Sequence, residues 1–298
     1  MKPFYTIMFV LSVLLLCASI AALIIYGLNF GVDFTGGSLM ELEFRAGHPS
    51  IEEAAAFLKS SGDSSFGDIA ITPVGASVLI LRMRELTEDE HRQILNSLGQ
   101  KFDELDPAEK RFDSIGPSVG EELKKASIIA IATLLAAVLL YIAYMFRALS
   151  RSLSLWAMAA GTLLGLAHDI LIPMGLFAVL GHFYGVQITA VYVAAVLTIL
   201  GYTVSDKVVI YDRVRENILR GSREPLPDLV HKSVMQTLIR SINNTLVVIL
   251  SSLAVFLFGG ESIRYFALAL MVGIGLGAYS SIFVASPTLV WLSRKKNK

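Results

Sequence analysis

The sequence has little cysteine, little charge and no excess of charge of either sign. Its single cysteine, Cys17, excludes an intrachain disulfide and a metal site built from several thiolates. Charged residues make up 17% of the 298 residues, whereas an ordinary globular chain has roughly 25%. The formal net charge is zero, and without a basic domain the sequence predicts no nucleic-acid binding. Hydrophobic residues make up 54%, which indicates an integral membrane protein.

Six apolar runs are long enough to cross a bilayer, because a spanning helix needs roughly 20 mostly apolar residues. They cover residues 4–28, 126–146, 153–180, 188–210, 238–258 and 265–292, and a basic tail follows at 293–298. The first run exceeds the core of a cleaved signal peptide, so we expect an uncleaved span. Leu16 and Cys17 resemble a lipoprotein cleavage site only weakly, because Leu16 is not small.

The segment from residue 29 to residue 122 has the composition of a small soluble domain. Strands are predicted at residues 39–45, 68–72, 77–83 and 111–115, with a hairpin turn at 73–76. Capping boxes at Ser50 and Thr87 predict helices that run to Lys59 and to Pro107. This order predicts a ferredoxin-like α+β domain between the first two helices of a polytopic, six-helix α-helical membrane protein. We expect His48 and His91 on its surface.

Basic residues predict the orientation of the chain. With six spans both termini share a side, and that side carries Lys2, Arg147, Arg151, Arg213, Arg215, Arg220, Arg223, Lys232 and the basic tail. Cytoplasmic loops are enriched in lysine and arginine. The termini are therefore expected in the cytoplasm and the ferredoxin-like domain on the other side of the membrane.

Asp206 is the strongest candidate for a functional group. It lies in the span at 188–210, roughly 9 Å inside the polar block at 212–217 at 1.5 Å per residue. A carboxylate within a span costs about 2.5–3.5 kcal/mol, so we interpret Asp206 as a group that takes up and releases a proton. A structural carboxylate near the surface is the alternative. Lys207 could neutralise Asp206, but adjacent helix residues point about 100° apart and need not face each other. The lysine can instead extend toward the cytoplasm.

Arg240 enters the fifth span at a depth similar to that of Asp206, because the fourth and fifth spans run antiparallel. An arginine that faces the carboxylate favours its ionised form, so a conformational change at that contact would load and unload a proton. Asn244 lies one turn further on the same face and could hold water or bond across helices. An arginine that only extends to the interface, and an asparagine that only joins helices, are the plainer alternatives.

Other polar and small residues lie within the spans. His168 and Asp169 are near the middle of the third span, where they either orient the bundle or continue a proton route, since histidine titrates near neutral pH. Gly273 and Gly277 of the sixth span form a small-xxx-small pair that permits close helix packing.

Two glycine-rich stretches flank the soluble domain. Residues 29–38 contain glycines that let the chain turn sharply as it leaves the membrane. The second stretch, residues 116–120, precedes the second span. On physical grounds alone each stretch is a turn.

Taken in order, these stretches make the chain similar to the SecF family, the smaller subunits of the SecD–SecF accessory complex of protein export. The motifs that carry the resemblance are Asp33, Phe34, Thr35, Gly36 and Gly37 within 31–37; Gly116, Pro117 and Gly120 within 116–121; His168-Asp169; 199–202; Ser205-Asp206; 212–217; 258–260; and 280–287. They extend almost from end to end of the chain. The extracytoplasmic region is too short for SecD.

The resemblance implies a multi-pass protein of the RND superfamily in the bacterial inner membrane, with a periplasmic domain. Its expected partners are SecD, the SecYEG channel, unfolded preproteins and the lipid bilayer, with YajC as a further candidate. It implies no enzyme activity and no cofactor, with protons as the coupling ion. Asp206 and Arg240 fall on the family's proton-linked positions. The chain departs from the family pattern at Lys207 and Asn244, where threonine is common.

Several functions stay open at this point. One is a proton-driven subunit for protein export, and another is a non-pumping scaffold that holds SecD and the channel together. An RND-type small-molecule or lipid exporter is disfavoured by the small external domain. Asp169 and Asp206 also allow an intramembrane aspartyl protease, but their depths differ by roughly 12 Å and the Gly-x-Gly-Asp signature is absent.

Overall fold

The computed structural model describes residues 2–45, 47–61, 69–102, 107–147 and 154–293. The chain divides into two compact units, one of residues 30–127 and one of residues 1–29 and 128–298. Each unit is described by itself. Arg151, Asp68, Leu105 and the basic tail at 294–298 lie outside the described residues.

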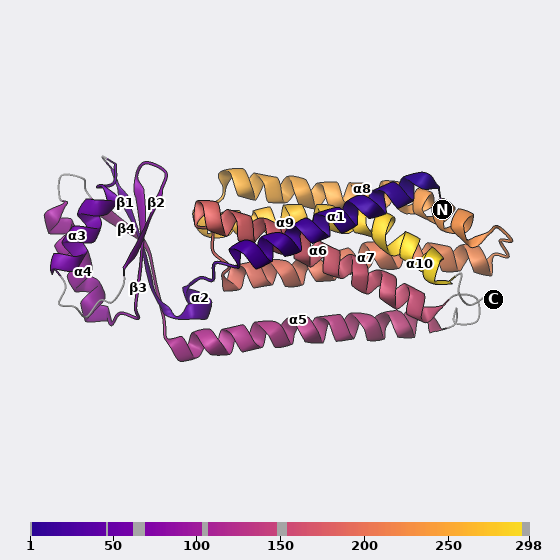
Figure 1. Cartoon of the computed structure of the whole chain (residues 1–298), viewed down its shortest axis with the longest axis horizontal. Helices are drawn as coiled ribbons and strands as arrows, with labels where there is room; N and C mark the ends of the chain where they lie inside the picture. Colours follow the sequence, from indigo (N-terminus) through magenta and orange to yellow (C-terminus); the bar gives the residue numbers. More distant parts are fainter. Residues whose placement is uncertain (1, 46, 62–68, 103–106, 148–153, 294–298) are drawn as a thin grey trace. The chain divides into compact units, whose positions relative to one another are not determined.

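The smaller unit contains a four-stranded antiparallel sheet in the order β2-β3-β1-β4. Its elements are α2 (Val32–Thr35), β1 (Gly37–Phe44), α3 (Ile51–Ser61), β2 (Ala70–Val74), β3 (Val78–Met83), α4 (Glu88–Lys101) and β4 (Pro107–Ile115). Both α3 and α4 lie on one face of the sheet (Figure 1). This topology confirms the predicted ferredoxin-like arrangement.

Alternating side chains of the strands form the core of this unit. Met40, Leu42 and Phe44 of β1 and Leu79 and Leu81 of β3 point toward the helices and are buried. The period of two in the sequence places these apolar side chains on one face of the sheet. That face is covered by the apolar sides of α3 and α4, which the capping boxes start at the predicted places.

Local details of this unit differ from the sequence expectations. Helix α4 ends at Lys101, not at Pro107, and β4 starts at Pro107, four residues before the expected position. His91 is 8% exposed, not on the surface as expected. Its Nε2 lies 2.7 Å from Glu109 Oε1 and its ring stacks on Phe112, because β4 passes alongside α4.

The larger unit is a helix bundle. Its helices are α1 (Pro3–Tyr26), α5 (Pro117–Met145, which begins in the smaller unit), α6 (Leu155–Tyr184), α7 (Ala190–Leu219), α8 (Leu226–Phe258), α9 (Glu261–Ser280), the π-helical η4 (Ser281–Ala285) and α10 (Ser286–Ser293). Six helical segments of the described chain are long and apolar enough to cross a membrane, and the last of them joins α9, η4 and α10. The six-helix membrane fold is therefore confirmed.

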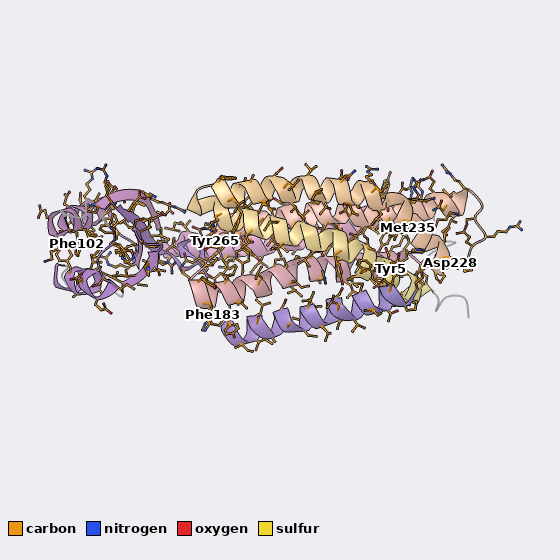
Figure 2. The ribbon with its side chains drawn as sticks, turned by 90° about the horizontal axis from the view of Figure 1, so that it is seen from above. Tyr5, Phe102, Phe183, Asp228, Met235 and Tyr265 are labelled. Carbon is orange, nitrogen blue, oxygen red and sulfur yellow. The ribbon has the colours of Figure 1, made fainter. Side chains whose placement is uncertain are left out.

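Helices α6 and α7 form the interior of the bundle, with α1 and α9 packed on α6 and α8 and α9 packed on α7. Large apolar side chains such as Phe183 and Met235 are exposed on the outer faces (Figure 2). This inside-out distribution suits a hydrocarbon environment, where exposed apolar surface carries no penalty. The polar segment after 210 is also largely helical, since α7 continues to Leu219 and α8 begins at Leu226.

Candidate functional site

Buried charged and polar groups of the bundle lie on two sides of α7, one toward α6 and one toward α8. His168 and Asp169 lie on α6, Asp206 and Lys207 on α7, and Ser241 on α8. All are buried, with exposures of 5% or less. Helix α7 is central to this arrangement because adjacent residues point about 100° apart. Asp206 therefore faces α8 while Lys207 faces α6.

Lys207 forms a fully buried ion pair with Asp169. Its Nζ donates to Asp169 Oδ2 at 2.7 Å and to the carbonyl of Thr203 at 3.3 Å, and both charged side chains are 0% exposed. The second oxygen of Asp169, Oδ1, lies 3.2 Å from His168 Nδ1, which donates to it. Both carboxylate oxygens of Asp169 thus have a partner.

Lys207 does not extend toward the cytoplasm, which was one of the two positions that the sequence allowed. Its side chain crosses to α6 instead, into space that Gly165 leaves open, because a methyl group at Gly165 would overlap Lys207 Cε. The signal in the sequence was a glycine on α6 one turn before Asp169. A lysine inside a bundle needs a nearby carboxylate, and Asp169 supplies it.

Asp206 has a different environment. Its Oδ1 accepts a hydrogen bond from Ser241 Oγ at 2.9 Å. Its Oδ2 is buried, and the described part of the chain gives it no hydrogen-bond partner. Thr203 Oγ1, one turn earlier on α7, is also buried and has no hydrogen-bond partner among the described residues. Among the described residues, Asp206 is therefore bonded through a single carboxylate oxygen.

Arg240 and Asn244 are exposed on α8. Within the described residues no ion pair joins Arg240 to Asp206, and Ser241 is the side chain of α8 that contacts the carboxylate. Ser241 is not among the residues predicted from the sequence. The signal was a stripe of hydroxyl residues at helical spacing, Thr237, Ser241 and Thr245, all buried.

His168 and the glycines of α9 shape the surroundings of these groups. The His168 ring stacks on Tyr279 at a centroid distance of 5.9 Å, and its Nε2 is buried without a partner among the described residues. Methyl groups at Gly273 and Gly277 would overlap Ile199 and Thr203 of α7. The two glycines therefore bring α9 close to the α7 face that carries Thr203.

The two glycine-rich motifs meet each other within the smaller unit. Gly36 and Gly37 have φ angles of 72° and 112°, which favour glycine. A methyl group at Gly36 would lie 2.7 Å from Pro117 Cα, and one at Gly120 would lie 3.2 Å from the Phe34 carbonyl.

The other motif residues lie in the same unit. Asp33 and Thr35 are in α2, and the Thr35 Oγ1 donates a hydrogen bond to the Gly31 carbonyl. Gly116 packs near the Glu85 carboxylate. These motif residues form a junction, not part of the bundle site.

Comparison with family models gives two matches. Residues 94–295 match the C-terminal family of the protein export membrane proteins SecD and SecF. Residues 21–47 match the SecD/SecF GG motif. Together the two matches extend over most of the chain and include both the junction and the bundle site.

Known proteins are similar over nearly the whole chain. The protein translocase subunit SecF of Thermobaculum terrenum is 37% identical over 95% of this chain and 90% of its own length. The subunit SecDF of Brucella abortus is 37% identical over 98% of this chain. The crystal structure of SecDF from Thermus thermophilus matches with a TM-score of 0.82 and 31% identity over 99% of this chain. This chain spans only 37% and 38% of those two SecDF chains.

Proposed function

The chain belongs to the SecD/SecF family of protein-export membrane proteins, and we propose that it works with a SecD partner to drive preprotein translocation with the proton-motive force. It is a SecF-type protein translocase subunit. The proposed coupling ion is the proton, which Asp206 binds and releases. The proposed work is transport of a polypeptide, without covalent chemistry.

The difference between the two buried aspartates carries this proposal. Asp169 is neutralised by Lys207 and bonded on both oxygens, so it gains little from a proton. Asp206 is 5% exposed and, within the part of the chain that the structure describes, is bonded only through Oδ1. A buried carboxylate without a full set of partners is costly, and binding a proton relieves that cost. Asp206 is thus the carboxylate suited to exchange a proton, while Asp169 and His168 hold Lys207.

The unpartnered polar atoms along α7 support a route for the proton. Thr203 Oγ1 and Asp206 Oδ2 lie one turn apart on the same helix and are both buried. Buried polar atoms without a protein partner are usually satisfied by ordered water. A few waters between α7, α8 and α9 would connect Asp206 to one side of the membrane.

The exposed face of α8 supports the requirement for a partner. Arg240, Asn243 and Asn244 are exposed there, interspersed with Ile239 and Ile242 at 75% and 50% exposure. Polar side chains in a span seldom face lipid. We propose that a SecD-type helix covers this face and brings Arg240 and Asn244 into the coupling site. The SecDF relatives, in which this chain matches a little over a third of the length, support the same partner.

Further partners and the location complete the proposal. The similar SecDF crystal structure is described as translocon-associated, which supports the SecYEG channel as a neighbour, with preproteins as substrates and YajC as a further candidate. We place the chain in the bacterial inner membrane, with cytoplasmic termini and a periplasmic ferredoxin-like domain. The basic residues at the Arg213 end of α7 support this orientation.

The test is proton-gradient-dependent preprotein translocation into vesicles that contain SecD, with Asp206→Asn compared with the parent. Both proteins must accumulate equally and co-purify with SecD. Asp206→Asn keeps an acceptor for Ser241 but cannot exchange a proton, so the gradient-dependent step is expected to be lost.

Asp212→Asn is the matched control, because the same substitution falls on the same helix beyond the apolar segment, where Asp212 pairs with Arg215 at 2.8 Å. This control is expected to translocate normally. If Asp206→Asn assembles and translocates as well as the parent, the proton proposal is wrong and a scaffold role replaces it.

A further inference from the structure

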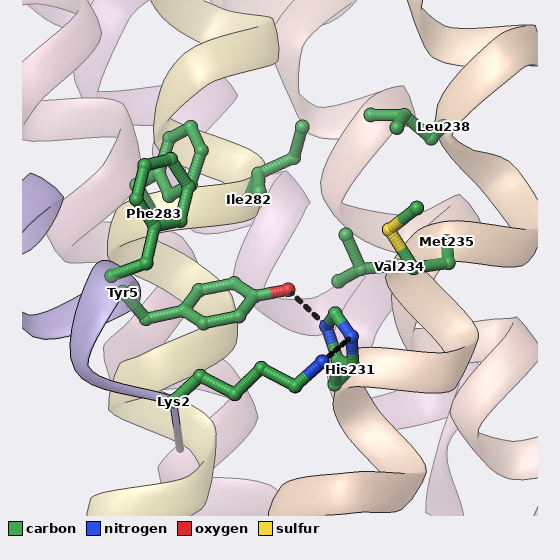
Figure 3. Close-up of a pocket in the computed structure, with 9 residues that line it drawn as sticks. Lys2, Tyr5, His231, Val234, Met235, Leu238, Ile282 and Phe283 are labelled. Carbon is green, nitrogen blue, oxygen red and sulfur yellow. Dashed lines mark hydrogen bonds between the residues drawn. The ribbon is translucent and has the colours of Figure 1, made fainter.

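A cavity of about 170 Å³ lies in the bundle beside the start of α1 (Figure 3). Residues of α1, α8 and η4 form its walls. The lining is apolar except at one end, where Lys2, Tyr5 and His231 meet. The cavity belongs neither to the Asp206 site nor to the glycine-rich junction.

The polar end retains unused hydrogen-bond donors. Lys2 Nζ donates to His231 Nε2 at 2.8 Å. His231 therefore carries its proton on Nδ1 and donates to the Tyr5 hydroxyl, also at 2.8 Å. Lys2 still has two N–H donors and Tyr5 its own O–H, because the described part of the chain offers their side chains no further hydrogen bond. An ammonium and a hydroxyl at the same end of a cavity match the oxygens of a phosphate.

The apolar part of the cavity continues along the helix axis. Val234, Met235 and Leu238 follow His231 on α8 at +3, +4 and +7, so they line a stripe about 10 Å long. Phe283 lines the wall opposite α8, and its ring makes an edge contact with the Phe4 ring. Phe4 and Met235 are each 53% exposed, so the rim of the cavity faces the hydrocarbon around the bundle.

The positions of the charged end and of the apolar stripe along the span suit the headgroup and the acyl chain of a lipid. Lys2 directly precedes the first residue of α1, so the charged end lies at the boundary of a span. Headgroups lie at this level, and basic pockets between spanning helices bind them. The apolar stripe extends from there into the span, in the direction in which acyl chains run.

We propose that this cavity binds a membrane phospholipid. Its phosphate contacts Lys2 and Tyr5, and one acyl chain lies along Val234, Met235 and Leu238. The lipid would then join α1 to α8 at the end of the bundle where His231 already links them.

The experiment is native mass spectrometry of the full chain in detergent, titrated with phosphatidylglycerol or with a neutral glycolipid that has the same acyl chains. The parent is expected to retain phosphatidylglycerol in preference to the glycolipid. Lys2→Gln should bind phosphatidylglycerol about fivefold more weakly, the effect of one basic contact, and should lose the preference. Met235→Trp fills the cavity and should abolish retention of both lipids.

Lys232→Gln is the matched control, because this exposed lysine follows His231 in the chain and pairs with Glu224 at 2.7 Å. It should bind both lipids as the parent does, and all variants must unfold at the parental temperature without added lipid. The proposal fails if Lys2→Gln and Met235→Trp retain phosphatidylglycerol like the parent. It also fails if inorganic phosphate alone displaces the lipid, or if Met235→Trp releases a co-purifying protein instead of lipid.

Discussion

Helix α7 carries buried charged residues toward both α6 and α8. The carboxylates on these two sides have different partners. On the α6 side, Asp169 is bonded on both oxygens and neutralised by Lys207. On the α8 side, the Ser241 hydroxyl is the one hydrogen-bond partner that Asp206 has among the described residues. The neighbouring residues Asp206 and Lys207 could have paired with each other, yet the helix directs them apart. We infer that pairing, not burial alone, separates a structural carboxylate from one suited to exchange a proton.

Removal of the lysine should destabilise the α6 side most. Lys207→Met leaves the Asp169 carboxylate buried without a counter-ion, so we expect the free energy of unfolding to fall by about 3–5 kcal/mol. Denaturant unfolding in micelles measures this change. The double variant Lys207→Met/Asp169→Asn should recover most of it. If the double variant is as unstable as the single one, charge pairing is not what holds this contact.

A methyl group in the space beside the lysine should have a smaller effect. Gly165→Ala overlaps Lys207 Cε, and overpacking of this kind costs about 1–3 kcal/mol. The same unfolding assay measures it. In a Lys207→Ala/Asp169→Asn background the space is empty, so the cost should vanish. A cost that persists there would show that Gly165 packs against something other than the lysine.

Loss of the hydroxyl on the α8 side should change stability little. Ser241→Ala removes one hydrogen bond, and such bonds in membrane bundles average about 0.6 kcal/mol. Gradient-dependent translocation should nevertheless become less sensitive to pH in the range where Asp206 titrates, because Ser241 is the contact that orients its carboxyl. Ser251→Ala, an exposed serine on the same helix, is the control. Equal pH profiles for both variants would contradict a role for Ser241.

The smallest change in stability is expected at the capping box of the smaller unit, where water screens the charges. Hydrogen bonds from Arg84 and from the Thr87 backbone and hydroxyl lower the pKa of Glu90 to about 2. Because the folded pKa lies below the usual 4.5, the capping box contributes its stability above that value and loses it as pH falls toward about 2. Hydrogen exchange at the start of α4 should accelerate, relative to Glu90→Gln, only in this interval. If hydrogen exchange accelerates equally in the parent and in Glu90→Gln as the pH falls, the stabilising role of ionised Glu90 is contradicted.

The sequence predicted the regular parts of the fold well. Six spans, the strand and helix order of the soluble unit and the capping boxes depend on local periodicity, which is readable in one chain. Helix lengths were underestimated because polar turns beyond the bilayer carry no apolar signal. In α7 these turns include Arg213, which pairs with Glu216 at 2.6 Å.

The sequence singled out His168, Asp169 and Asp206 as polar groups within the spans, but not the contacts that they make. Polar residues at 168, 169, 206 and 207 stand out in apolar runs, yet the rotation of each helix decides which of them meet. Lys207 turns inward because Gly165, 42 residues earlier in the chain, leaves space on α6. Arg240 is exposed because the face of α8 that carries it lies outside this chain's own packing. Such long-range relations are not contained in local patterns.

The difference between the two carboxylates can be observed directly. Infrared difference spectroscopy of the SecD-bound protein, recorded as the pH is varied, detects the carbonyl band of a carboxylic acid that gains and loses a proton. We predict a band that disappears in Asp206→Asn and persists in the Lys207→Met/Asp169→Asn variant. A titrating band that survives Asp206→Asn and is lost with Asp169 would show that the α6 side carries the proton, contrary to the roles assigned here.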